Sequence, residues 1–214
     1  MSNVLETMRS RYTTKHYAGE AVPAEKLETL LEVLRLSPTS VNGQASKFFV
    51  AEGAEARAKL IPALMDFNQE RCEKCGALIV CAVPEDYDEA QFARVFEQEI
   101  KDGRYEGLPS VEGMDAGRRH FVNMHKNRGD LVAWETHQSY IAMGMLLYAA
   151  AELGVDSTAL EGVEFDKMDE ILGLREKGLR SVWAVALGKR APNDSNAARP
   201  KSRLPMETVM TLSL

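Results

Sequence analysis

The spacing of apolar and polar residues along the chain predicts helices alternating with strands. The clearest helix covers residues 24–36, where four leucines share one helix face: Leu27, Leu30, Leu31 and Leu34. Pro23 stands where a first-turn proline is tolerated, and Ser37-Pro38 is expected to end the helix. Further helices are predicted over residues 3–10, 54–64 and 88–101.

Three apolar runs predict strands, over residues 47–51, 77–83 and 182–187. The run 77–83 is apolar without interruption, which is typical of a strand that is covered on both faces. The polar segment 11–22 is predicted to be irregular, and the glycine-rich segment 103–113 to be a loop.

A long helix is predicted between Asp130, as its cap, and Leu153, with Gly154 as its stop. Its second half is apolar nearly all round, which indicates burial on every side. In a chain of 214 residues this favours a central helix that is also covered by a partner subunit. The polar tail 190–214 has few apolar anchors, so we expect it either to fray or to wrap a neighbour.

Helices come first in this order, and strands separated by helices follow, which predicts an α+β sandwich of sheet and helices. Hydrophobic residues make up 45% of the chain and charged residues 27%, as in globular proteins. No linker-like segment divides the sequence. We therefore expect residues 1–214 to form a single domain.

The net charge of −6 argues against a nucleic-acid partner, because nucleic-acid binders carry a basic face. Three cysteines in a chain of this length do not suggest a disulfide framework. The N-terminus lacks a signal-peptide pattern, and the longest nearly apolar run, 141–151, is well short of the roughly 20 residues that span a bilayer. These features predict a cytoplasmic protein without a membrane partner.

The usual catalytic and metal-binding signatures are missing from the sequence. No dinucleotide fingerprint, P-loop or HExxH pair is found, and Cys72 and Cys75 form a lone CxxC without two further zinc ligands. We expect no metal, and we interpret these cysteines as partly buried thiols near a helix.

Two basic segments have the chemistry of a phosphate site, namely residues 11–15 and residues 200–205. Each combines guanidinium, ammonium and hydroxyl groups in non-helical backbone, and these groups suit a phosphate. Either segment alone favours the simpler interpretation, a solvated pair of surface charges. Composition alone does not show whether these two segments meet in the folded chain.

Five separated motifs occur in a fixed order: Arg11-Tyr12-Thr13-Thr14-Lys15, Ser37-Pro38-Thr39-Ser40-Val41-Asn42-Gly43-Gln44, Phe67-Asn68-Gln69-Glu70-Arg71, Leu160-Glu161-Gly162 and Pro200-Lys201-Ser202-Arg203-Leu204-Pro205. Together they resemble the FMN-dependent nitroreductase superfamily, in the enteric branch of oxygen-insensitive NAD(P)H nitroreductases and flavin reductases. The similarity extends over essentially the whole chain.

The resemblance implies a three-layer sandwich, with a central, mixed but mostly antiparallel sheet flanked by helices. It implies a homodimer intertwined around a long central helix, with two FMN sites at the subunit interface. The implied activity is two-electron reduction of small aromatic acceptors, nitroaromatics and quinones, by a ping-pong mechanism. FMN would be bound non-covalently, and NAD(P)H would be a transient co-substrate.

The resemblance also assigns residues to the flavin. Those expected at its phosphate end are Arg11, Tyr12, Thr13, Lys201 and Arg203. Those expected at its polar ring edge are Lys15, near N1 and the C2 carbonyl, with Asn68 and Arg71. Those expected from the other subunit are Pro38, Thr39, Ser40 and Asn42.

Four residues are implied in the reaction itself. Lys15 would stabilise the negative charge that develops at the pyrimidine edge. The backbone N–H groups of Glu161 and Gly162 would bond flavin N5 and O4, and Phe121 would lie over the substrate side of the ring. The chain departs from the family pattern at Ala45-Ser46 and at Ala159, which leaves its acceptor preference open.

Three other interpretations remain open at this stage. One is a flavin or dihydropteridine reductase on the same scaffold. Another is a flavin-binding module that stores FMN without turnover. The last is an acidic dimerisation domain whose basic pairs are merely solvated.

Overall fold

One antiparallel sheet forms the centre of the computed structural model, which describes residues 4–211. Its strand order is β1-β2-β4-β3, and all three neighbouring pairs are antiparallel. The strands are β1 Lys47–Ala51, β2 Ala77–Pro84, β3 Asp156–Leu160 and β4 Leu179–Gly188. In the described part of the chain the single parallel pairing is an isolated bridge between Thr13 and Ser157. The predicted α+β class is confirmed.

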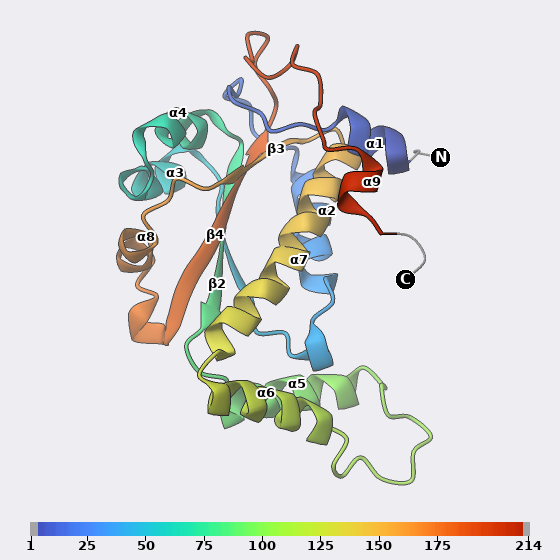
Figure 1. Cartoon of the computed structure of the whole chain (residues 1–214). Coiled ribbons are helices and arrows are strands. Elements are labelled where there is room, and N and C mark those ends of the chain that lie inside the picture. Colours follow the sequence, from blue (N-terminus) through green and yellow to red (C-terminus); the bar gives the residue numbers. More distant parts are fainter. Residues whose placement is uncertain (1–3, 212–214) are drawn as a thin grey trace.

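Helices cover both faces of this sheet (Figure 1). On one face lie α3 (Ala54–Leu60), α4 (Asp66–Lys74) and α8 (Phe165–Leu172), and on the other lie α2 (Ala24–Leu36) and α7 (Leu131–Glu152). Strand β2 alternates between the two cores, since Leu78 and Val80 enter the first and Ile79 and Cys81 the second. The result is a sandwich of three layers.

Two more helices lie beyond one end of the sheet, at the bottom of Figure 1. They are α5 (Glu89–Lys101) and α6 (Ala116–Arg128). The Asp88 carboxylate caps α5 by accepting the Gln91 N–H at 2.8 Å. A small core joins them to α7 and to the end of β2: Tyr87, Phe92, Val122 and Leu131.

Both ends of the described chain lie at the opposite end of the molecule, beside the C-terminal end of α7 (Figure 1). There α1 (Val4–Ser10) packs against α7, and the tail carries the short helix α9 (Met206–Val209). The predicted first helix is present, although Asn3 lies outside the described residues, as do the last three positions of the tail. Three single-turn segments complete the chain: η1 (Ser40–Asn42), η2 (Ile61–Ala63) and η3 (Arg175–Lys177).

The predicted elements agree with the structure to within a few residues at their ends. Four elements were not predicted, namely α4, α6, β3 and α8, and the tail contains a helix where extended chain was expected. The Asp130 carboxylate does not cap α7 as predicted, because it pairs with His125 Nδ1 at 2.7 Å. Gly154 follows the helix with a φ of +67°, as its predicted role as a stop requires.

Helix α7 is covered on only one face within this chain. The side chains that it buries are Leu131, Glu135, Ser139, Ala142, Leu146 and Ala150, of which the last three pack in the core beside the sheet. On the outer face Tyr140, Ile141 and Met145 are 43–49% exposed. Residues 4–211 of one chain therefore do not bury this helix on every side. Within residues 4–211, neither α7 nor any other helix is long and apolar enough to cross a membrane.

Candidate functional site

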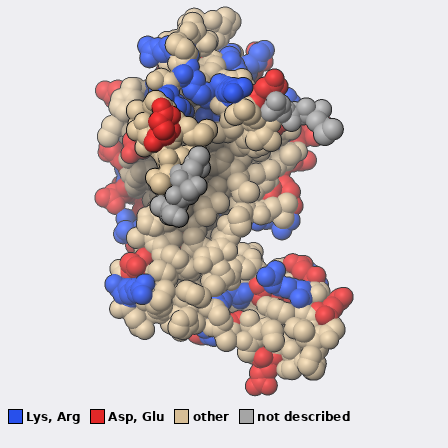
Figure 2. Space-filling model, turned by 45° about the vertical axis from the view of Figure 1, so that its right-hand side comes forward, with Lys and Arg blue, Asp and Glu red and all other residues tan. Residues whose placement is uncertain are grey.

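The two basic segments that sequence alone could not join meet in the structure. They line one cavity of about 490 Å³, between residues 9–13 at the end of α1 and residues 196–203 of the tail. Lys201 links them directly, because its ammonium donates to the Met8 carbonyl at 2.7 Å and also to the carbonyl of Arg11, 190 positions away. Figure 2 shows Lys and Arg side chains gathered at this upper end of the molecule.

Six cations line this cavity, and among residues 4–211 no carboxylate lines it. Burial, and then the charge of Arg203, lowers the pKa of Arg11. Burial lowers the pKa of Lys201, and the charges of Arg11 and Arg203 lower it further. The buried Arg11 Nε has no hydrogen-bond partner in residues 4–211. Groups arranged in this way are suited to bind a multiply charged anion such as a phosphate.

The adjoining segment 12–17 lies along the edge of the sheet beside β3. Thr13 bridges to Ser157, and its carbonyl accepts the Asn196 side-chain amide at 2.8 Å. The Tyr12 ring lies under the Arg190 guanidinium, with 4.8 Å between the Arg190 Cζ and the ring centroid. Both Tyr12 and Thr13 line the basic cavity.

Lys15 is fixed at the next position by its own backbone. The buried Asp194 carboxylate accepts the N–H groups of Lys15 at 2.8 Å and His16 at 3.2 Å. Arg71 in α4 donates from Nε to the Lys15 carbonyl at 3.3 Å. Burial raises the pKa of Asp194, but the Lys15 N–H and other donors outweigh this and hold the pKa below its ordinary value.

A hydrogen-bonded chain continues from Lys15 to the end of β3. The Arg71 guanidinium donates to the Asn68 side-chain oxygen, and the buried Asn68 amide donates to the Gly162 carbonyl at 3.0 Å. A Cβ at Gly162 would lie 2.5 Å from Phe67 Cζ, so this position requires glycine. Glu161 is exposed beside it. The structure thus brings Lys15, Asn68, Arg71 and Gly162 into one cluster, next to the basic cavity.

The loop 38–42 does not join this cluster within one chain. Ser40 N–H bonds the Gln138 side chain at 2.7 Å, whereas Lys26, at the other end of α2, bonds the Leu153 carbonyl at 2.6 Å. Gln138 and Leu153 are 15 residues apart along α7 and its cap, which at the helical rise corresponds to roughly 22 Å. The end of α1 and the tail, whose residues line the basic cavity, lie beside the C-terminal end of α7 (Figure 1). Pro38, Thr39, Ser40 and Asn42 are therefore remote from Arg11 and Lys15.

Buried charges hold this loop in place. Asn42 donates to Glu99 at 2.7 Å, and Arg118 donates to Glu99 at 2.6 Å and to the Val41 carbonyl at 3.2 Å. Val41, Asn42 and Gln44 have φ of 48–52°, a region that non-glycine residues rarely adopt. Backbone strain of this kind persists only where neighbouring contacts impose it, and it is concentrated at functional sites.

Phe121 lies with the loop rather than with Lys15. It is in α6, the helix whose Arg118 bonds the Val41 carbonyl, and 43% of it is exposed. The edge of the neighbouring His120 ring meets the Phe121 ring at 5.3 Å between centroids. The predicted site residues therefore form two groups at opposite ends of one chain.

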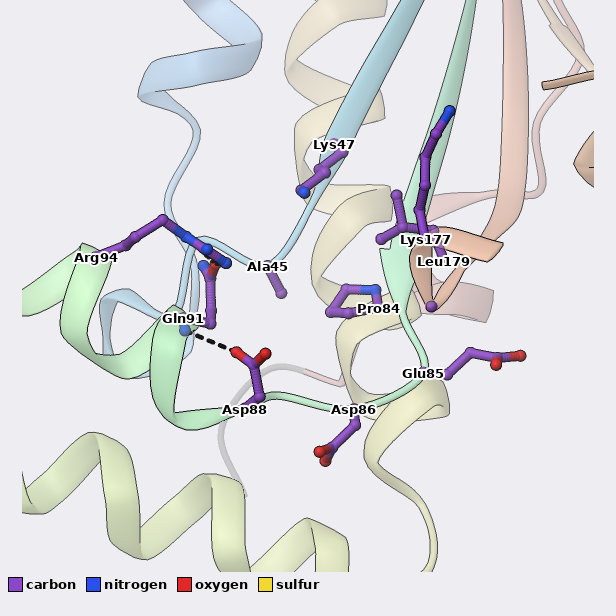
Figure 3. Close-up of a pocket in the computed structure, with 11 residues that line it drawn as sticks. Ala45, Lys47, Pro84, Glu85, Asp86, Asp88, Gln91, Arg94, Lys177 and Leu179 are labelled. Carbon is purple, nitrogen blue, oxygen red and sulfur yellow. Dashed lines mark hydrogen bonds between the residues drawn. The ribbon is translucent and has the colours of Figure 1, made fainter. Parts of the chain in front are cut away.

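A separate cavity of about 380 Å³ lies between β2, the start of α5 and η3 (Figure 3). Its carboxylates are already engaged: Asp88 caps α5, Asp86 pairs with Lys126 at 2.6 Å, and Glu85 pairs with Arg175 at 2.6 Å. None of the predicted site residues lines it. We therefore place the candidate site at the basic cavity and the Lys15 cluster.

Two residues of the candidate site were missed by the sequence analysis. Phe67 is 61% exposed and adjoins Gly162. The centroid of its ring lies 5.9 Å from the Arg71 Cζ. Its position in the motif beside Asn68 was a signal that could have indicated it. Asp194 had no such signal, because it is one acid in a polar tail, 179 positions from the lysine that it holds.

One known protein family matches most of this chain. The family model described as "Nitroreductase family" matches residues 8–189. The oxygen-insensitive NAD(P)H nitroreductase of Salmonella typhimurium is 32% identical over 98% of this chain and 99% of its own length. The major NAD(P)H-flavin oxidoreductase of Aliivibrio fischeri is also 32% identical, over 98% of each chain.

Solved structures share the fold at lower sequence identity. A protein from Exiguobacterium sibiricum, solved in complex with FMN, superposes with a TM-score of 0.80 at 23% identity, over 100% of this chain and 98% of that one. A nitroreductase family protein from Streptococcus pneumoniae gives a TM-score of 0.76 at 20% identity, over 99% and 100% of the two chains. At these identities the likeness establishes the fold alone. The family match and the full-length relatives establish more: this chain belongs to the nitroreductase family and is an oxidoreductase.

Proposed function

We propose that this protein is an FMN-dependent NAD(P)H oxidoreductase that passes electron pairs to nitroaromatics and quinones. We propose that it acts as a cytoplasmic homodimer, with two FMN sites between the subunits. The observation that carries the proposal is the meeting of two basic segments, 190 positions apart, in one cavity beside the Lys15 cluster.

The residues present fit the cofactor. Arg11, Lys201 and Arg203 offer three positive charges and an orphaned donor to a phosphate that carries about two negative charges. Next to them, Lys15, Asn68 and Arg71 offer polar groups for the edge of a flavin ring. Gly162 has no side chain, and the Phe67 ring and the Asn68 amide lie close to it.

FMN, when bound, supplies the hydride and electron-pair chemistry of the reaction. The contribution of this chain is electrostatic and positional. The Lys15 backbone is held from both sides, by Asp194 at its N–H and by Arg71 at its carbonyl, so the point from which its charged side chain extends is fixed before reduction begins. Glu161 and Gly162, at the end of β3, would offer their backbone N–H groups to the ring.

The dimer supplies the part of the site that one chain cannot. Loop 38–42 and Phe121 lie roughly 22 Å along α7 from the end that carries the basic cavity. The exposed apolar face of α7 lies between these two regions, and a second copy packed on it would complete the site. Phe121 would then cover the substrate side of a flavin that is held mainly by the other subunit.

The experiment that tests the proposal measures FMN binding. Arg11→Ala and Arg203→Ala should each weaken FMN binding roughly 10- to 100-fold, since a charged hydrogen bond contributes about 1.5–3 kcal/mol. Arg94→Ala, in the distant helix α5, is the matched control and should bind FMN like the wild type. Unchanged FMN affinity in both cavity variants, or a purified protein that cannot be loaded with FMN, would reject the proposed function.

A flavin reductase is the second candidate, and the relative named NAD(P)H-flavin oxidoreductase favours it. Steady-state comparison of nitrofurazone, menadione, free FMN and dihydropteridine as acceptors separates the two activities. A module that only stores FMN is tested by adding NADPH to the yellow protein without oxygen. Prompt bleaching of the flavin absorbance rejects the storage function.

In the proposed site, NAD(P)H and the acceptor use the same open face of the flavin ring. The oxidised nicotinamide therefore has to leave before the acceptor enters. Double-reciprocal plots at several acceptor concentrations should therefore be parallel. Intersecting lines would show that both molecules are bound together, and would contradict a shared site.

A further inference from the structure

The basic cavity contains more positive charge than one FMN phosphate requires. Within residues 4–211 its lining includes no carboxylate, although the protein as a whole has a net charge of −6. The cations that line it are Arg9, Arg11, Arg190, Arg199, Lys201 and Arg203. A phosphate monoester carries about two negative charges, and Arg11, Lys201 and Arg203 already exceed that number.

One of the three remaining arginines has a structural role. Arg190 pairs with Asp156 at 2.6 Å and covers the Tyr12 ring. Arg9 and Arg199 are different, because both are exposed and neither lies within 4 Å of a carboxylate of the described residues. They lie on the two walls of the cavity, Arg9 at the end of α1 and Arg199 in the tail.

Arg199 lies in a turn of the tail that is bonded to the segment preceding Lys15. Its N–H bonds the Asn196 carbonyl at 3.1 Å, and the Asn196 side chain holds Thr13. Burial and the charge of Arg71 lower the pKa of Lys15, Asp194 opposes this, and Arg199 lowers that pKa further. Arg199 is therefore within electrostatic reach of both the phosphate end and the proposed flavin edge.

We propose that Arg9 and Arg199 form a second phosphate-binding site, which takes a phosphate of the nicotinamide dinucleotide while it is bound for hydride transfer. The inference rests on the proposed function. Guanidinium groups bind phosphate oxygens in bidentate fashion, and exposed arginines can do so without displacing the FMN phosphate. Two phosphate sources share this chemistry: the pyrophosphate, which NADH and NADPH both carry, and the 2′-phosphate, which only NADPH carries.

The test is the KM for each dinucleotide in the FMN-loaded variants Arg9→Ala, Arg199→Ala and the double variant. We expect KM to rise roughly tenfold in the double variant, with kcat at saturation unchanged, since a charge-assisted contact to the co-substrate is lost. A rise for NADPH alone identifies the 2′-phosphate, and an equal rise for both identifies the pyrophosphate. An unchanged KM for both overturns the proposal.

A second readout does not depend on turnover. Calorimetry of oxidised, FMN-loaded protein with 2′,5′-ADP and with 5′-ADP should show binding that the double variant loses, and binding that persists in that variant contradicts the proposal. The matched control is Arg35→Ala, because Arg35 is an exposed arginine of α2 that already pairs with Glu32. It should leave both KM and binding unchanged.

FMN content separates failure of this inference from failure of the proposed function. The double variant should retain FMN like the wild type. If it loses FMN, Arg9 and Arg199 belong to the FMN site and the second site is rejected. If instead Arg11→Ala and Arg203→Ala retain FMN with wild-type affinity, the proposed function itself fails, whatever the KM values show.

Discussion

Glu135 is a buried carboxyl group of α7, and neither of its oxygens has a hydrogen-bond partner in the described chain. Burial, reinforced by the nearby charge of Asp86 and opposed by Lys126, raises its pKa to about 8. An unfolded chain would lose this proton near the ordinary value of 4.5. Unfolding therefore releases a proton between these two pH values, and the free energy of unfolding should fall as the pH rises through that window.

Glu135→Gln should remove this pH dependence. At pH 7 the variant should be more stable than the wild type by roughly 3 kcal/mol, because pH 7 lies about 2.5 units above 4.5 and each unit costs about 1.4 kcal/mol. Urea unfolding at several pH values measures the effect. Glu28→Gln, at an exposed position of α2, is the control and should keep the wild-type slope. A Glu135→Gln variant with that same slope would show that Glu135 does not hold its proton.

Asp194 is a second single residue with a local effect, because its carboxylate holds the backbone of Lys15. Asp194→Ala removes the acceptor of two N–H groups, so Lys15 is no longer held beside the proposed flavin edge. The midpoint potential of the bound flavin should become more negative, because a displaced Lys15 charge stabilises the reduced flavin less. Lys15→Met removes that charge and should shift the potential in the same direction. Asp194→Asn keeps a side-chain oxygen and should shift the potential less. Equal potentials in wild type and Asp194→Ala would limit this residue to a structural role.

At the scale of elements, α5, α6 and the loop 38–42 depend on one buried ion pair. Arg118 is 3% and Glu99 5% exposed at their side chains, and their closest atoms are 2.6 Å apart. Arg118→Met leaves Glu99 buried without this partner, so it should cost about 3–5 kcal/mol of unfolding free energy. Arg119→Met, one residue on, breaks surface pairs with Glu89 and Asp115 and should cost about 0–1 kcal/mol. Urea titration of both variants makes the comparison, and similar losses would contradict it.

Elements with a one-sided or fully apolar pattern could be predicted from sequence. The leucines of α2 and the uninterrupted apolar run of β2 are examples, because burial alone determines where such residues lie. Strand β3, Asp156–Leu160, could not be predicted in this way. Its buried Thr158 is satisfied by hydrogen bonds to the Thr14 carbonyl and the Tyr17 hydroxyl, which come from a distant segment.

The candidate site was predictable only in part, for a related reason. The motifs indicated which residue types could bind a flavin phosphate, but not that Arg11 and Lys201 are neighbours. Asp194 and Arg199 belong to no motif, and only the path of the folded tail places them beside Lys15. Tertiary packing determines which polar residues from distant segments become neighbours, and the local spacing of residues in the sequence does not report this.

At the scale of the whole molecule, the prediction concerns the outer face of α7. Ile141 is 49% exposed at the middle of that face. Ile141→Arg should dissociate the proposed dimer and release FMN in the same step. The reason is that the loop 38–42 of a chain is remote from its own basic cavity, so the loop that completes each site comes from the partner subunit. Sedimentation velocity and flavin content measure the two effects. Glu170→Arg, in α8 on the opposite face of the sheet, is the control. A variant that is monomeric but retains FMN tightly would show that one chain suffices.

The basic cavity also has a consequence for how the protein is made. Residues 11–15 leave the ribosome early, whereas Lys201 and Arg203 follow only after every strand of the sheet has been synthesised. A nascent chain therefore lacks two of its three proposed phosphate-binding cations until the core is complete, so cofactor capture has to be a late event in biogenesis. For the same reason, proteolytic clipping after Asp194 should release the flavin from an otherwise folded body.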